Sequence, residues 1–287
     1  MVKVRRGYRS RNVEYRGAAS GGGGMRLPQS RGGKMGAGAG GAGLIGIIIV
    51  VVMALLGGGG GGGFGQVGLG PTGGDGGTVG AAPEQSDFYE AVFDDVQNTW
   101  IRIFEGAGED YREAKLVIFQ DVVDTGGCGR ATEAVGPFYC PADETAYFDP
   151  DFFDELAGPR FGAPGDFAIA YVIAHEIAHH VQNVTGVSGE VRQRQQGKSQ
   201  TEVNDLSIRL ELQADCLAGV WAFEATRRPA TFEGNDNILY LERGDLEEGL
   251  VAAAAVGDDH IQETAGAQID PHNWNHGSSR QRQAWLT

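Results

Sequence analysis

The sequence has only three cysteines, Cys128, Cys140 and Cys216, among 287 residues. No Cys-x-x-Cys pair occurs, which argues against a zinc site built from thiolates. Two of the cysteines lie close together and the third is distant. We therefore expect one local disulfide, Cys128 to Cys140, if the domain lies outside the cytoplasm, and one buried thiol. Two free buried thiols are the alternative for the close pair.

No apolar run reaches the roughly 20 residues that a membrane-spanning helix needs. The run at residues 44–56 has 13. However, no charged residue occurs between Lys34 and Asp75, so residues 36–56 form an uncharged stretch of sufficient length. We expect a single transmembrane anchor at residues 36–56. A cleaved signal peptide and a buried core segment are the alternatives.

Basic residues are scarce after the first 34 positions. Residues 1–34 hold nine Lys or Arg against one acid, Glu14, whereas the whole chain has a net charge of −15. Positive charge only on the N-terminal side of an apolar segment predicts that this side is cytoplasmic. We expect residues 1–35 to be a disordered cytoplasmic arm and the catalytic domain to be extracytoplasmic. An arm that binds nucleic acid is the alternative, and we expect no nucleic-acid partner.

Glycine is abundant, with 48 residues, but most of them precede residue 85. Seven consecutive glycines at residues 57–63 cannot form a stable helix or strand. Residues 57–84 are therefore predicted to be a flexible linker, and residues 85–287 to be the folded domain.

The predicted domain contains one helix, then a group of strands ahead of the active-site helix, and no internal repeat, which favours an α+β fold. Residues 115–149 predict a small antiparallel sheet, and residues 187–200 and 257–275 read as polar or irregular loops. Apolar periodicity predicts helices at residues 87–104, 165–185, 201–226, 245–256 and 278–286.

The strongest chemical signal is His175-Glu176-Ile177-Ala178-His179, inside the predicted helix 165–185. Residues four apart lie on one helix face, so His175 and His179 can bind one metal ion. Glu176 lies beside them, where it can act as general base on a water that the metal activates. His180 is turned about 100° away and is expected to be a packed histidine rather than a ligand.

A catalytic zinc ion takes three protein ligands and leaves one position for water. The next long helix carries Glu211 and Asp215, again four residues apart. We expect Glu211 to be the third ligand of one Zn²⁺, and Asp215 to accept a hydrogen bond from His175. A solvated acidic face is the alternative for this pair. His276 is the candidate donor to the oxyanion of the tetrahedral intermediate, with a surface-loop histidine as its alternative.

Several segments together carry a family resemblance: residues 136–141, 147–149, 152–153, 175–182, 209–219, 257–259 and 276–278. With them the chain resembles the predicted bacterial neutral zinc metallopeptidases, which are membrane-anchored proteins. The resemblance covers most of residues 85–287, without the basic arm and the glycine tether. It implies a zincin-like fold of the gluzincin type, with Glu as third ligand, but it names no substrate.

The sequence thus predicts a membrane-anchored zinc peptidase that hydrolyses peptide bonds in a peptide or protein substrate. A domain that binds zinc for structure and acts as an interaction module, with little turnover, is the alternative.

Overall fold

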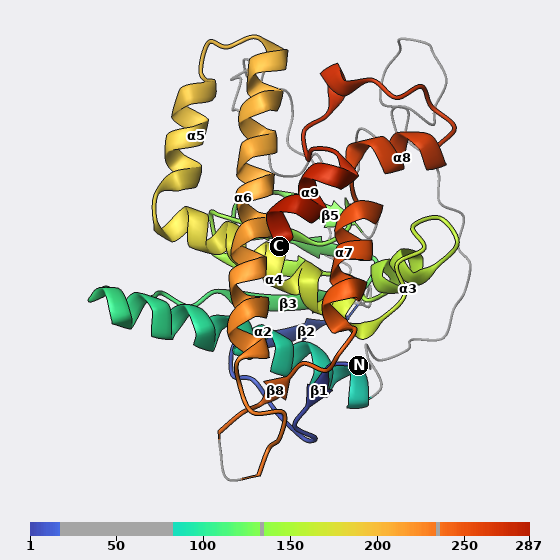
Figure 1. The fold of residues 1–287 in the computed structure, drawn as a ribbon. Helices are drawn as coiled ribbons and strands as arrows, with labels where there is room; N and C mark the ends of the chain where they lie inside the picture. The colour runs from blue at the N-terminus through green and yellow to red at the C-terminus, as the bar shows by residue number, and fades with distance from the viewer. Residues whose placement is uncertain (18–82, 133–134, 234–235) are drawn as a thin grey trace, which may run out of the picture.

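Figure 1 shows the computed structural model, which describes residues 1–17, 83–132, 135–233 and 236–287. This part of the chain is an α+β domain, in agreement with the predicted fold class. Helix α4 contacts strands β6 and β7 of the main sheet, and helices α6 and α7 both pack against α4. The helices are α2 (Pro83–Ala107), α3 (Asp151–Ala157), α4 (Asp166–Val184), α5 (Val187–Gln195), α6 (Gln200–Thr226), α7 (Asp245–Ala255), α8 (Asp258–Thr264), η2 (Pro271–Asn273) and α9 (Ser279–Leu286). The strands are β1 (Lys3–Val4), β2 (Val13–Arg16), β3 (Lys115–Phe119), β4 (Val122–Asp124), β5 (Arg130–Thr132), β6 (Phe138–Cys140), β7 (Thr145–Phe148) and β8 (Leu239–Tyr240).

The main sheet has the strand order β2-β3-β7-β6 and is mixed, so the prediction of an antiparallel sheet holds for the pairs β4–β5 and β6–β7 and is wrong for β3–β7. Strands β2, β3 and β7 are parallel, and only β6 runs against them. The difference follows from the connections. Residues 141–144 form a short turn that makes β6 and β7 antiparallel, whereas long connections separate β2 from β3 and β3 from β7.

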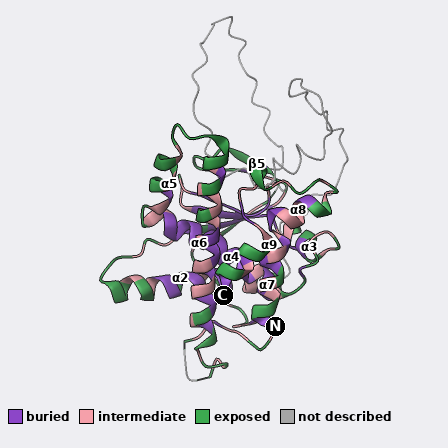
Figure 2. Cartoon of the chain, turned by 45° about the horizontal axis from the view of Figure 1, so that its top comes forward, coloured by how far each residue is buried: buried purple, intermediate pink, exposed green. Residues whose placement is uncertain are grey.

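Helix α4 is the centre of the domain. Every residue from Tyr171 to Gln182 is buried, as expected for a helix that is apolar on nearly all sides. Figure 2 shows this buried helix surrounded by elements with exposed outer faces. Gly165, with φ of 125°, brings the start of α4 against α7, where the Glu248 carboxylate accepts a hydrogen bond from the Phe167 backbone N–H. The N-terminus of α4 is thereby capped by a neighbouring helix.

Helix α6 runs along α4 and agrees with the helix predicted at residues 201–226. It begins with a capping box, in which the side chains of Ser199 and Glu202 bond to each other's backbone N–H. The polar stretch 187–200, predicted as a loop, instead contains α5. That prediction failed because a helix with most of its faces in solvent needs no continuous apolar stripe. The pair Glu190–Arg194 supports such a helix at i,i+4 spacing.

Residues 1–17 are ordered, so the prediction of a disordered arm over residues 1–35 is wrong for this part. Strand β2 extends the main sheet beside β3, and its Val13 and Tyr15 pack against the large core. Strand β1 pairs with β8, and Val2 is buried in the same core. Burial of these apolar residues, which the charge pattern alone does not reveal, fixes the segment to the domain.

The basic and polar side chains of residues 1–17 meet acidic residues of α2. Arg9 forms an ion pair with Asp87, and both Tyr8 and Ser10 donate hydrogen bonds to Asp94 at 2.8 Å. The positive charge of the segment is thus complemented by the acidic domain. The number of basic residues in the sequence does not reveal that their side chains are paired with acidic residues of α2.

The predicted anchor at residues 36–56, and all but the last two residues of the predicted linker at 57–84, lie outside the described residues. Where the structure is described, no helix is both long and apolar enough to cross a bilayer. Membrane attachment and localisation therefore stay predictions.

Cys128 and Cys140 form a disulfide, as expected, and Cys216 is a free thiol. The bond links β6 to the loop that precedes β5. Since Cys216 is only half-buried, the expectation of a buried thiol is met in part.

Candidate metal centre

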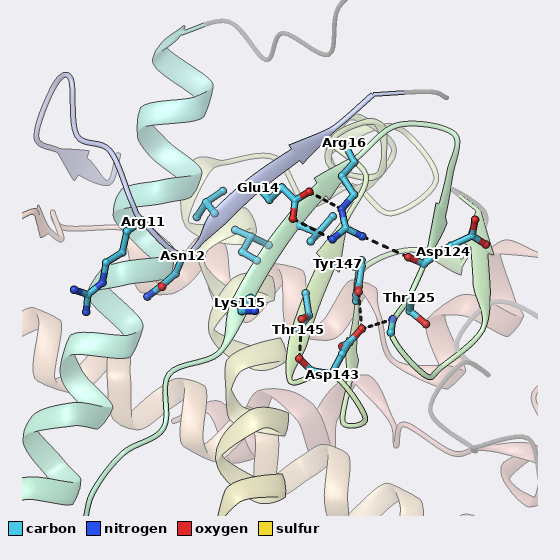
Figure 3. Close-up of a pocket in the computed structure, with 14 residues that line it drawn as sticks. Arg11, Asn12, Glu14, Arg16, Lys115, Asp124, Thr125, Asp143, Thr145 and Tyr147 are labelled. Atoms are coloured by element: carbon cyan, nitrogen blue, oxygen red, sulfur yellow. Dashed lines mark hydrogen bonds and ion pairs between the residues drawn. The ribbon is translucent and has the colours of Figure 1, made fainter. Parts of the chain in front are cut away.

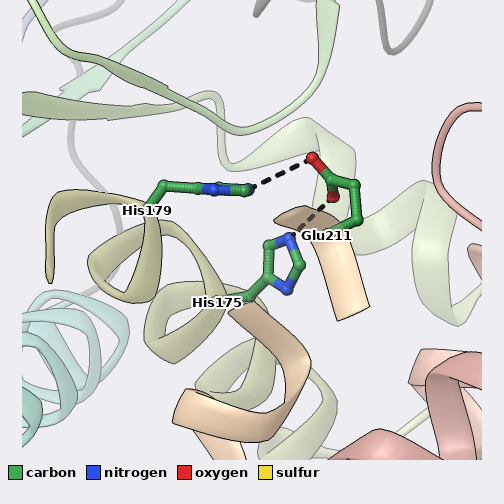
Figure 4. A group of neighbouring side chains, drawn as sticks. All are labelled: His175, His179 and Glu211. Carbon is green, nitrogen blue, oxygen red and sulfur yellow. Dashed lines mark hydrogen bonds and ion pairs between the residues drawn. The ribbon is translucent and has the colours of Figure 1, made fainter. Parts of the chain in front are cut away.

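Three side chains from two helices converge at one point, as Figure 4 shows. His175 and His179 lie one turn apart on α4, with ring centroids separated by 4.8 Å. Glu211 reaches them from α6. Its Oε2 lies 3.2 Å from His175 Nε2, and its Oε1 lies 3.4 Å from His179 Nε2. Two imidazoles and one carboxylate are the ligand set of a catalytic zinc site of the His₂Glu type, so these residues fit a zinc ion.

The charges of these groups favour a cation at the point of convergence. Burial alone would lower the pKa of both imidazoles, but the neighbouring carboxylates outweigh it. Asp215 and Glu211 raise the pKa of His175 to about 9, and Glu211 raises the pKa of His179. Burial would raise the pKa of Glu211, yet the two imidazoles hold it well below its usual range. The metal-free site thus stabilises positive charge where a divalent ion would supply it.

Glu176 is buried beside the two histidines. Burial raises the pKa of its carboxyl group, against the opposing effect of His179 and His175. No residue in the described ranges forms a hydrogen bond with this carboxylate. A buried carboxyl with a raised pKa and no competing partner suits a general base.

Asp215 is completely buried and lies behind His175. Its Oδ1 is 2.8 Å from His175 Nδ1 and also accepts a hydrogen bond from the Tyr171 hydroxyl at 2.6 Å. Both oxygens accept from Arg282 of α9. Because Nδ1 donates to Asp215, Nε2 is the ring nitrogen of His175 that faces Glu211 and can bind a metal once its proton is lost. The sequence reasoning missed Tyr171 and Arg282, whose contacts exist only in the tertiary structure.

The second ligand imidazole is oriented by Gln182, another residue that the sequence reasoning missed. His179 Nδ1 lies 2.8 Å from Gln182 Oε1, and the Gln182 amide donates to the carbonyl of Leu210 on α6. Gln182 follows His179 by three residues on one helix, and this spacing could have indicated that the two side chains meet.

His276 is buried and lies next to the helix that carries Glu211. Its Nδ1 is 2.9 Å from an oxygen of Asp258, whose other oxygen accepts the backbone N–H of His276 itself. The following residue, Gly277, packs against Ile208 and Leu212 of α6. His276 is therefore no surface-loop histidine, and Asp258 fixes its ring. The sequence reasoning did not assign Asp258 a role.

His180 lies away from the three ligands, as expected. Its Nδ1 is 2.8 Å from the Tyr139 hydroxyl, and its Nε2 meets the carbonyl of Arg112 at 2.5 Å. Burial lowers the pKa of His180. It is a neutral, packed histidine that ties α4 to the sheet.

A polar pocket of about 530 Å³ lies elsewhere, between β2, β3, β7 and the turn at residues 124–126 (Figure 3). None of the metal-centre residues lines it. Its Arg16 is held by Glu14 and by the carbonyl of Asp124. Val117 and Tyr147 in its wall belong to the smaller core, on the sheet face away from α4. The pocket is thus separate from the convergent side chains.

The family model described as "Putative neutral zinc metallopeptidase" matches residues 2–287. The match includes residues 2–17, although the resemblance seen in the sequence was limited to residues 85–287. The β2–β3 pairing explains why the N-terminal segment belongs with the rest.

Two similar proteins have no assigned function. The uncharacterized protein YpfJ of Escherichia coli K12 is 44% identical over 203 residues, which are 71% of this chain and 67% of that protein. The uncharacterized protein Rv2575 of Mycobacterium tuberculosis is 43% identical over 197 residues, 69% of this chain and 64% of that protein. No solved structure matches the chain.

Proposed function

The chain belongs to the neutral zinc metallopeptidase family, and from this premise we propose that it is a zinc-dependent hydrolase of peptide bonds with a zincin-like catalytic domain. One observation carries the proposal. His175, His179 and Glu211 present three ligand atoms within 4.8 Å of one another, and Glu176 is buried beside them. Three ligands leave a fourth position for water and substrate, which is typical of catalytic rather than structural zinc.

When bound, zinc would act as a Lewis acid that polarises the substrate carbonyl and lowers the pKa of a water molecule to about 7. Glu176 would take the proton of the attacking water and then give it to the leaving amine, because it is the carboxylate beside the ligands that forms no hydrogen bond with any described residue. His276, held by Asp258, would donate a hydrogen bond to the developing oxyanion.

Replacing Glu176 by Gln tests the catalytic role. The amide keeps the size of the side chain but cannot accept a proton. We expect zinc to stay bound, because Glu176 is no ligand, and peptide hydrolysis to fall roughly 10²- to 10⁴-fold. Zinc content and cleavage of a peptide library by the full chain are the measurements.

The control for this variant is Glu190→Gln on α5, an exposed position that should leave both quantities unchanged. Undiminished hydrolysis by Glu176→Gln would overturn the assignment of the base. Bound zinc in a wild-type protein that cleaves no peptide would favour the second candidate function, a zinc-stabilised interaction module.

Glu211→Ala tests the third ligand. We expect loss of zinc binding, since two imidazoles alone are a poor site, and retention of α6, whose capping box is far from this position. Asp205→Ala, an exposed acid on the same helix, is the matched control. Zinc bound with wild-type affinity in Glu211→Ala would show that another residue is the ligand.

We also propose that the domain works outside the cytoplasm. The disulfide between Cys128 and Cys140 supports this, because such bonds persist in oxidising compartments. Attachment to the membrane through residues 36–56 remains a prediction.

A further inference from the structure

Arg282 is a charged residue buried in the interior of the domain, with 4% of its surface exposed. It lies on α9, and its guanidinium donates hydrogen bonds to both carboxylate oxygens of Asp215 on α6. Nε donates to Oδ2 at 2.9 Å, and one terminal nitrogen donates to Oδ1 at 2.9 Å. The same terminal nitrogen lies 3.1 Å from the Tyr171 hydroxyl of α4. Three helices thus meet at one carboxylate.

The Asp215 carboxylate needs this partner because it is completely buried and ionised. A buried charge without a counter-charge is strongly destabilising. His175 cannot supply the counter-charge while it binds a metal, since a ligand imidazole is neutral. Once His175 is neutral, Arg282 is the cation that contacts Asp215 in the described part of the chain.

The two-point contact also fixes the orientation of the carboxylate. A guanidinium that binds both oxygens of a carboxylate holds the two groups in one plane, which a lysine ammonium cannot do. With Oδ2 held by Nε, Oδ1 is kept in place before His175 Nδ1, at 2.8 Å. The ring of His175 is thereby aimed with Nε2 toward Glu211.

We propose that Arg282 is a positioning residue of the metal centre, which acts through Asp215 to aim the His175 imidazole at the metal. The C-terminal helix α9 is in this way part of the metal site, although it supplies no ligand. The inference rests on the proposed zinc function and adds to it a residue that touches neither metal nor substrate.

The test compares the full-length wild type with Arg282→Lys, which keeps the charge but loses the planar fork. We expect Arg282→Lys to weaken zinc binding roughly 10- to 100-fold in competition with a chelator, as is usual when the outer partners of a metal ligand are changed. We also expect its Co²⁺-loaded form to have an altered visible absorption spectrum, because that spectrum reports ligand geometry. A loss of stability alone would not change the spectrum.

Arg280→Gln is the matched control, since Arg280 is exposed on the same helix, and it should behave as wild type. A second variant, Asp215→Asn with Arg282→Gln, removes both charges and therefore leaves no unpaired charge in the core. It should show the same loss of zinc affinity even if Arg282→Lys does not fold. Wild-type affinity and spectrum in either variant would overturn the inference. The failure of the proposed function itself would be distinct, because the wild-type protein would then cleave no peptide or would bind no zinc through Glu211.

Discussion

The imidazole of His175 contacts two carboxylates from one helix, Asp215 through Nδ1 and Glu211 through Nε2. Each contact favours the protonated ring, which is why the pKa of His175 rises to about 9 although burial opposes it. A metal ion takes the place of the Nε2 proton. The residue is therefore a site of competition between protons and zinc.

This competition gives a pH prediction. Because the pKa of His175 lies near 9 in the metal-free protein, zinc binding at neutral pH should release a proton, and zinc affinity should rise with pH up to about 9. The stability of the metal-free protein should instead fall as the pH rises. The pKa of His175 is higher in the folded state than in the unfolded chain. The stabilisation that its protonated ring provides is therefore complete below about pH 6.5 and is lost as the pH rises through about 9.

Calorimetry of zinc binding in two buffers with different ionisation enthalpies measures the released protons. Thermal unfolding of the metal-free protein between pH 6 and 10 measures the second trend. Equal binding enthalpies in both buffers would contradict the proton competition.

At the residue scale, the sequence predicts what helix geometry determines. His175 and His179 must share a face because they are four residues apart, and Glu211 and Asp215 share one for the same reason. Arg282 follows no such rule. It lies 67 residues from Asp215 in sequence, and only the packing of α9 against α6 brings them together. A lone arginine in a polar C-terminal segment gives no signal of that contact.

At the scale of elements, the long helices were predictable because each buries a broad apolar face. This holds for α4, α6 and α7. The helices α5 and α8 were not, since they are short and polar. Whether neighbouring strands run parallel or antiparallel could also not be predicted from the sequence. An apolar run such as β3 indicates burial, but whether its neighbour is parallel depends on connections of many residues.

The disulfide makes a prediction at this scale. Cys128 and Cys140 close a loop with a sequence separation of 12. Replacing both by Ala should lower the free energy of unfolding by roughly 3 kcal/mol, because the unfolded chain gains the conformations that the closed loop excluded. Denaturant unfolding of the double variant measures this value. Cys216→Ala is the control, as it removes a thiol without opening a loop.

That double variant should keep its zinc affinity, since the disulfide contacts none of the three ligands. Unchanged stability would mean that the unfolded chain is not restricted by the bond under the conditions used.

At the scale of the whole molecule, residues 1–17, 83–132, 135–233 and 236–287 form one packed body. Strand β2 extends the sheet beside β3, and β1 pairs with β8 near the end of α6. We therefore expect the N-terminal segment and the catalytic domain to occupy the same compartment.

Thiol labelling in intact cells tests this expectation. Arg6→Cys and Arg192→Cys place single exposed thiols in the N-terminal segment and in α5, both in a Cys216→Ala background. A membrane-impermeant thiol reagent should label both variants or neither. Labelling of only one of them would show that the two parts are separated by a bilayer.

The pairing of β2 with β3 has a consequence for how this chain can meet a membrane. The chain leaves the sheet after residue 17 and re-enters the domain at residue 83, so the intervening residues begin and end on the same body. Two ends that are fixed to one body lie on the same side of a bilayer. A single traverse, with residues 1–17 inside the cell and the domain outside, would therefore require β1 to separate from β8 and β2 to separate from β3. Proteolytic removal of everything before residue 83 would likewise leave β3 as an unprotected edge, the kind of strand that recruits other chains.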